Sequence, residues 1–349
     1  MNPYGAATRR TLVTASVLAA VTIVFGAYVR LTDAGLGCPD WPGCYGRLLV
    51  PQSEAELAPG DPNLAQRPLE VGKAWREMIH RYLASTLGLV IIAAVALHAA
   101  AARAGVTRWR PAFVALLPLV VMQGVLGMWT VTLLLKPLVV TTHLLGGMAI
   151  LSLLFWNLLI ERDARAGFRS GPRTPWVVLA LTVLGCQIVL GGWTSTNYAA
   201  LACADFPTCH GSFRPPVDFA AGFRPWHGLG IDYEYGVLDA PARIAIHVTH
   251  RLGALVTALI AGGVAVTLVR RGNPGERRAG RVALGALGLQ LGLGVANVVL
   301  GLPVPVAVAH NAVAAALLVS FVASLYYSRA YSPAGATRGA AFGGRAVAS

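Results

Sequence analysis

The dominant feature of the chain is a series of long apolar stretches separated by polar connections. Each stretch holds about 20 residues, which is enough for a helix to cross the roughly 30 Å hydrocarbon core of a bilayer. No soluble domain remains between the stretches, so the pattern predicts an all-α integral membrane protein. Eight transmembrane helices are expected, at 10–31, 75–101, 111–134, 137–160, 175–196, 241–269, 281–300 and 303–328.

Composition and charge agree with a membrane protein. Only 12% of the 349 residues are charged and 56% are hydrophobic, whereas ordinary globular domains carry roughly 25% charged residues. The net charge of +13 does not indicate a nucleic-acid partner, because the basic residues lie at helix ends in short connections rather than in one patch. The first stretch lacks a signal-peptide cleavage site, so it is expected to stay in the protein.

The arginines predict the orientation of the chain. They gather on one side of the eight crossings, and by the positive-inside rule that side is the cytoplasm. Both termini are then cytoplasmic, and two long connections, 32–74 and 197–240, face outside. Four of the five cysteines lie in these connections, where an oxidising compartment lets thiols pair. The two spacings are "CPDWPGC" and "CADFPTC".

The second half of the chain repeats the first. A parallel repeat of four helices predicts two four-helix bundles side by side, related by a pseudo-two-fold axis along the membrane normal. We expect units at 1–165 and 166–330, followed by a disordered cytoplasmic tail at 331–349. Four landmarks recur at offsets between 165 and 170 residues: Cys38 and Cys203, His80 and His250, Gln123 and Gln290, and His143 and His310.

Four of the eight histidines belong to this repeat, on the second, fourth, sixth and eighth helices. Each lies a few residues from the predicted outer end of its helix, so each unit can bring two imidazoles to one depth. Two facing imidazoles in a four-helix bundle are typical of haem iron, which takes two axial nitrogen ligands. Copper and zinc sites more often combine clustered His and Cys at short spacings. The alternative is a set of structural histidines, hydrogen-bonded within the bundle.

An arginine follows one histidine of each unit directly. Arg81 follows His80 and Arg251 follows His250. Near the outer surface, these guanidinium groups could form forked hydrogen bonds with haem propionates. The alternative is an arginine that extends from a helix end to solvent.

The two units differ at one position close to these residues. Glu77 precedes His80 by three residues, so both project from one helical face, whereas the residue three places before His250 is His247. A carboxylate beside a porphyrin edge could accept a proton from water or stabilise a developing cation. The structural alternative is a glutamate that pairs with a nearby arginine or a loop residue.

The ordered set of motifs resembles the haem A synthase family across all eight helices. The motifs are "CPDWPGC", "EMIHR", "TTHLLGG", "HVTHR" and "AHNAVA". The resemblance implies an oxidoreductase that converts the C8 methyl of haem O to a formyl group by successive hydroxylations, with water as the oxygen source. It also implies that His80 and His143 hold the substrate haem and that His250 and His310 ligate a haem b cofactor. Glu77 would be the catalytic residue.

The resemblance further implies a disulfide between Cys38 and Cys44. Family members need not carry the second pair, Cys203 and Cys209, so its role stays open. Three pairings of the four loop cysteines exist on paper, and the short spacing favours the two local bridges. A redox-active role for Cys38 and Cys44 is a further hypothesis.

Three other functions remain open at the level of sequence. They are a di-haem b cytochrome for quinol-linked electron transfer, a membrane thiol-disulfide oxidoreductase, and a transporter built from repeats. The expected partners are haem O, membrane lipid, an unidentified electron acceptor, a haem O synthase and oxidase assembly proteins; a homo-oligomer is also open. The expected location is the cell membrane, with the haem sites toward the extracytoplasmic side.

Overall fold

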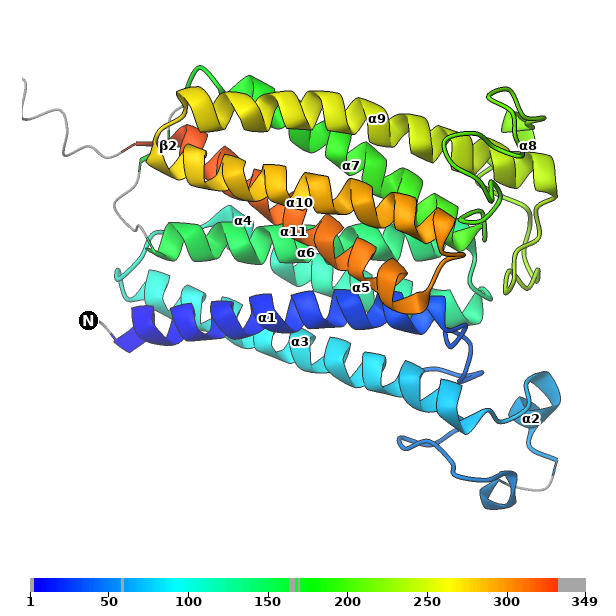
Figure 1. Cartoon of the computed structure of the whole chain (residues 1–349). Helices are drawn as coiled ribbons and strands as arrows, with labels where there is room; N and C mark the ends of the chain where they lie inside the picture. Colours follow the sequence, from blue (N-terminus) through cyan, green and yellow to red (C-terminus); the bar gives the residue numbers. More distant parts are fainter. Residues whose placement is uncertain (1–2, 58–59, 163–166, 169, 332–349) are drawn as a thin grey trace, which may run out of the picture.

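Long helices form nearly all of the computed structural model, which describes residues 3–57, 60–162, 167–168 and 170–331 (Figure 1). Within this part, eight helical spans are long and apolar enough to cross a membrane, which confirms the predicted fold class. The tail expected to be disordered lies, from residue 332 on, outside the described residues. The spans are α1 (Pro3–Leu31), α3 (Val71–Arg103), α4 and α5 together (Pro111–Val114 and Leu116–Thr132), α6 (Pro137–Arg162), α7 (Thr174–Thr196), α9 (Ala240–Arg271), α10 (Pro274–Val299) and α11 (Val304–Arg329).

The eight spans pack as two groups of four. The N-terminal group contains α1, α3, α5 and α6, and the C-terminal group contains α7, α9, α10 and α11. The groups meet where α1 and α6 contact α11 and where α6 contacts α7. One apolar cluster extends through both groups and includes the fully buried Leu154 and Phe321. This packing follows the predicted helix order, while the symmetry axis remains a prediction.

The shorter elements lie at the two ends of the bundle. Three short helices belong to the long connections, namely η1 (Glu54–Glu56), α2 (Pro62–Gln66) and α8 (Phe219–Gly222). At the opposite end, β1 (Gly167–Phe168) pairs antiparallel with β2 (Ala330–Tyr331). The labelled N-terminus and β2 both lie at that opposite end (Figure 1). Which end faces the cytoplasm remains a prediction.

Helix α10 begins seven residues earlier than the hydrophobic pattern predicts. The charged stretch before residue 281 reads as a loop, yet Asn273 and Glu276 form a capping box that starts the helix at Pro274. The Glu276 carboxylate also accepts hydrogen bonds from Arg173 Nε and Nη2, both at 2.9 Å. Helix α10 therefore begins where Asn273 and Glu276 cap its first turn, and not where the apolar residues begin.

The two cysteine-containing loops fold in the same way. In the first, the Asp40 carboxylate accepts hydrogen bonds from the N–H groups of Tyr45 and Gly46 at 2.6 and 2.7 Å. In the second, Asp205 accepts from the two N–H groups at the matching positions. The Thr208 hydroxyl and these N–H groups lower the pKa of Asp205 to about 2. The sequence repeat is thus matched by equivalent turns.

Replacement of Glu276 by alanine tests the charged start of α10. Glu276 is fully buried, so its removal leaves the Arg173 guanidinium without its carboxylate and removes one of the two hydrogen bonds of the capping box. We expect a loss of about 3 kcal/mol in the free energy of unfolding, as for other buried pairs that lose one partner, measured by denaturant unfolding in detergent. Glu56→Ala is the control, because the Glu56 pair with Arg47 is exposed and such pairs contribute less than about 1 kcal/mol. Equal losses in the two variants would contradict this account.

Candidate functional site

Each of the four recurring histidines lies against a glycine of a neighbouring helix. A Cβ on the glycine would collide with the imidazole at His80, would press on it at His250 and His310, and would make ordinary van der Waals contact at His143, so glycine permits the close approach of ring and helix backbone. The distances from such a Cβ to the ring Cε1 are 2.8 Å from Gly26 to His80, 3.6 Å from Gly127 to His143, 3.3 Å from Gly191 to His250 and 3.3 Å from Gly294 to His310. The repeat therefore preserves the histidines together with the space in which they lie.

In the N-terminal group, His80 lies on α3 and His143 lies on α6. The Nδ1 atom of each ring is buried and has no hydrogen-bond partner in the structure. Gln123 on α5 donates from Nε2 to the His143 backbone oxygen at 2.9 Å, while its own Oε1 is buried without a partner. Unpaired polar atoms inside a bundle are costly, so these rings are suited to a ligand.

In the C-terminal group, His250 on α9 and His310 on α11 contact glutamine amides. Gln187 Nε2 lies 3.0 Å from the His250 backbone oxygen and 3.1 Å from its Nδ1. Gln290 Nε2 lies 3.0 Å from His310 Nε2, and His310 Nδ1 is buried without a partner. Because a side-chain amide nitrogen only donates, both rings accept at these atoms. Each histidine of this group is therefore hydrogen-bonded to a glutamine of a neighbouring helix.

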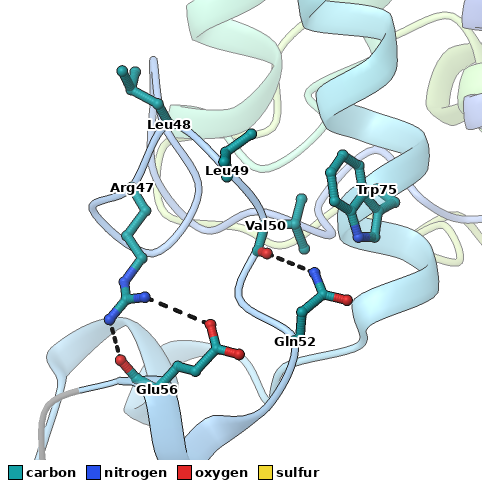
Figure 2. Close-up of a pocket in the computed structure, with 7 residues that line it drawn as sticks. All are labelled: Arg47, Leu48, Leu49, Val50, Gln52, Glu56 and Trp75. Atoms are coloured by element: carbon teal, nitrogen blue, oxygen red, sulfur yellow. Dashed lines mark hydrogen bonds and ion pairs between the residues drawn. The ribbon is translucent and has the colours of Figure 1, made fainter.

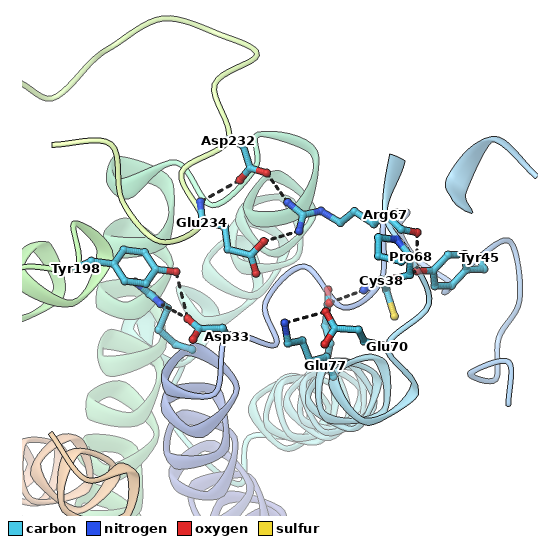
Figure 3. A network of polar contacts seen from close by, with 12 residues as sticks. Asp33, Cys38, Tyr45, Arg67, Pro68, Glu70, Glu77, Tyr198, Asp232 and Glu234 are labelled. Atoms are coloured by element: carbon cyan, nitrogen blue, oxygen red, sulfur yellow. Dashed lines mark hydrogen bonds and ion pairs between the residues drawn. The ribbon is translucent and has the colours of Figure 1, made fainter. Parts of the chain in front are cut away.

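Glu77 lies at the contact between α3 and the first disulfide loop (Figure 3). Its Oε2 accepts a hydrogen bond of 2.8 Å from the Cys38 N–H, and its Oε1 accepts from Arg81. The carboxylate is 4% exposed. Gly37 permits this contact, because a Cβ there would lie 2.6 Å from the Lys73 carbonyl carbon. Glu77 therefore fastens the loop to the helix.

His247 occupies the equivalent place in the C-terminal group. Its Nδ1 accepts a hydrogen bond of 3.1 Å from the Cys203 N–H, and its Nε2 lies 3.3 Å from Arg251 Nε. The two units therefore share the same loop attachment and differ in its charge. A carboxylate makes the contact in one unit and an imidazole makes it in the other.

Arg81 and Arg251 are both bound to backbone oxygens of the loops. Arg81 donates to the carbonyl oxygens of residues 40, 42 and 43, in addition to Glu77. Arg251 donates to those of residues 203, 205 and 208 at 2.9–3.0 Å. These contacts hold the disulfide loops over the helix ends. Both guanidinium groups therefore contact the loops, and haem propionates as their partners remain a prediction.

The structure joins Cys38 to Cys44 and Cys203 to Cys209. All four half-cystines are at most 3% exposed. A pocket of about 630 Å³ lies beside the first loop, between Arg47, Leu48, Leu49 and Trp75 (Figure 2). It contains no histidine and is separate from the imidazole pairs.

The glutamines are the site residues to which sequence reasoning gives no role. Gln123 and Gln290 recur at equivalent positions in the two halves of the chain, but the sequence does not connect either of them to a histidine. Gln187 has no glutamine counterpart in the first half of the chain, because the residue 165 positions before it is Thr22. A glutamine in an apolar helix is itself a signal in the sequence, because a polar side chain is costly inside a membrane unless it has a hydrogen-bond partner.

Comparison with known proteins identifies the family. Residues 9–322 match the COX15-CtaA family, described as cytochrome oxidase assembly protein. The chain is 43% identical over 314 residues to a haem A synthase of Shewanella oneidensis, covering 89% of this chain and 93% of the relative. It is 32% identical over 329 residues to a haem A synthase of a Caulobacter species, covering 87% and 90%. With its paired histidines on alternate helices, the chain belongs to the haem A synthase family.

Proposed function

We propose that this protein is a haem A synthase, an oxidoreductase that oxidises the C8 methyl of haem O to a formyl group by successive hydroxylations with water as the oxygen source. The observation that carries the proposal is the pairing of four histidines with four glycines on adjacent helices. Membership of the family supports the same reaction.

The donor set fits haem. A porphyrin supplies four iron ligands itself, so the protein needs only two neutral imidazoles from facing helices. Among the described residues, no group of three or more His, Cys, Asp or Glu side chains is suited to a bare metal ion. Unpaired ring nitrogens at His80 and His143 are consistent with ligation. When bound, haem supplies the redox chemistry, and the protein supplies ligation, position and local charge.

The two groups have different proposed roles. His80 and His143 hold the substrate haem in the unit at 1–165, and His250 and His310 hold a haem b cofactor in the unit at 166–330. Helix α9 packs extensively along α10, whereas the corresponding helices α3 and α5 contact each other much less. The looser contact suits a substrate that must enter and leave, and the tighter one suits a resident cofactor.

Glu77 is the proposed catalytic residue. It lies one helical turn from His80, and the residue that makes the equivalent loop contact in the C-terminal group is His247. Arg81 donates a hydrogen bond to Glu77 Oε1, and such charge-assisted contacts hold a carboxylate in one position. From this position, Glu77 can accept a proton from water or orient it toward the methyl group. Through its hydrogen bond with the Cys38 N–H, Glu77 also positions the first disulfide loop.

The alternative functions are not favoured. A thiol-disulfide oxidoreductase needs accessible sulfur, whereas both disulfides are buried. The family match does not favour a di-haem cytochrome or a transporter. Eight apolar spans indicate a multi-pass membrane protein. The proposed location of the haem sites is the extracytoplasmic side of the cell membrane, where haem O synthase, oxidase assembly proteins or a second copy are candidate partners.

Replacement of Glu77 by histidine separates catalysis from loop attachment. Histidine is the residue that makes this contact in the C-terminal group, so the variant should fold and keep its haem b. Conversion of haem O should fall at least about a hundredfold, because general acid–base groups contribute about 10²–10⁴ in rate. The measurement is chromatography and mass analysis of extracted haems.

The control for this variant is Glu70→Gln, which removes an exposed carboxylate near the same helix start. It should leave conversion unchanged. Wild-type conversion by Glu77→His would eliminate Glu77 as the catalytic residue.

Loss of single histidines tests the division between the two groups. His250→Ala and His310→Ala should remove the haem b that purifies with the protein, because each removes one axial ligand. His80→Ala and His143→Ala should retain haem b and lose binding of haem O. Absorption spectra and haem extraction measure both properties. If His80→Ala alone abolished the haem b signal, the assignment would be wrong.

A further inference from the structure

A segment of the second long connection crosses to the N-terminal group. We call residues 223–238 the outer strap. Arg67, from the first connection, forms ion pairs with Asp232 at 2.6 Å and with Glu234 (Figure 3). The Tyr233 N–H donates to the Leu134 carbonyl oxygen at 3.1 Å, in the turn between α5 and α6. The outer strap therefore covers one end of the group that contains His80 and His143.

Lys136 lies beneath the outer strap. Its side chain is 2% exposed, Nζ donates to the Gly228 carbonyl oxygen at 2.6 Å, and the ammonium stands over the Trp226 ring. Within the described part of the chain, no carboxylate forms an ion pair with it. An ammonium has three N–H donors, and burial of a charge without a counter-charge is unfavourable. The environment of Lys136 therefore suits an added anion.

A second hydrogen-bond donor lies at the same place. The Tyr233 hydroxyl is buried and has no hydrogen-bond partner in the structure, and its ring packs against Leu36, Val131 and Leu135. Lys136 and Tyr233 line one cavity of about 30 Å³. A cavity of this size holds a water molecule, and a larger group requires the outer strap to shift. One cationic and one neutral donor are a suitable pair for a carboxylate.

The position of Lys136 relates this cavity to the proposed substrate site. Lys136 precedes His143 by seven residues, which correspond to about 10 Å along a helix and return to the same face. That separation is comparable with the span from a porphyrin iron to the carboxylates at its edge. The repeat offset of 167 residues places Pro303 at the equivalent position before His310. At this position, therefore, the N-terminal group has a lysine ammonium and the C-terminal group has no charge.

We infer that Lys136 and Tyr233 bind a propionate carboxylate of the substrate haem beneath the outer strap. The inference rests on the proposed function, because His143 ligation places the macrocycle within reach of the cavity. Lys136 Nζ and the Tyr233 hydroxyl donate to the carboxylate oxygens. In haem, one propionate neighbours the C8 methyl, so the carboxylate contact orients the methyl that reacts. Lys136 and Tyr233 thus determine specificity by binding the acid edge of the substrate.

The test compares binding of haem O with binding of its dimethyl ester, whose propionates carry no charge. Both are titrated by absorbance into the full-length protein that retains its haem b. The wild-type protein should bind the free acid at least about tenfold more tightly than the ester, in line with a charge-assisted hydrogen bond. Lys136→Gln should lose this preference. Tyr233→Phe should weaken binding of the acid severalfold and leave binding of the ester unchanged.

Lys73→Gln is the matched control, because Lys73 is the other lysine of the chain and pairs with the exposed Glu70. It should keep the wild-type preference, and retained haem b reports an intact fold. An undiminished preference in Lys136→Gln would overturn the inference while leaving the proposed function intact. Failure of the wild-type protein to bind haem O at all would overturn both.

Discussion

Contact between an imidazole and a glycine backbone is the constraint on which the rest of this structure depends. Inside a membrane bundle, a histidine is costly, and its ring can approach the backbone of a neighbouring helix this closely only where no Cβ intervenes. Gly26 and Gly191 provide this space against His80 and His250. The helix pairs of both groups must therefore approach closely at these positions. The depth of the histidines follows from that approach.

The disulfide loops add a second constraint at the ends of the same helices. Glu77 and His247 each receive the N–H of a half-cystine, and the arginine one turn later binds the loop carbonyls. Duplication thus preserves the geometry of the attachment while its charge diverges. A carboxylate in one unit and an imidazole in the other give two similar bundles different chemical properties. Structural and catalytic roles of Glu77 are compatible, because the contact that fixes the loop also fixes the carboxylate.

The sequence predicts the helices and the loop repeat well, because each depends on local composition or on an internal repeat. It fails where a distant contact decides the structure. The start of α10 depends on Arg173, about one hundred residues away in the chain, and hydropathy cannot register that contact. The loop carbonyl oxygens that Arg81 contacts have no sequence signal either. Lys136 likewise gains its environment from a strap that arrives from the other half of the chain.

The most direct measurement is a structure of the full-length protein in lipid, determined with haem O bound. The account predicts one iron between His80 and His143 and a second between His250 and His310. It also predicts haem O at the first position, with its C8 methyl facing Glu77. A haem O bound away from the His80–His143 pair, or ligated by His250 and His310, would contradict the account.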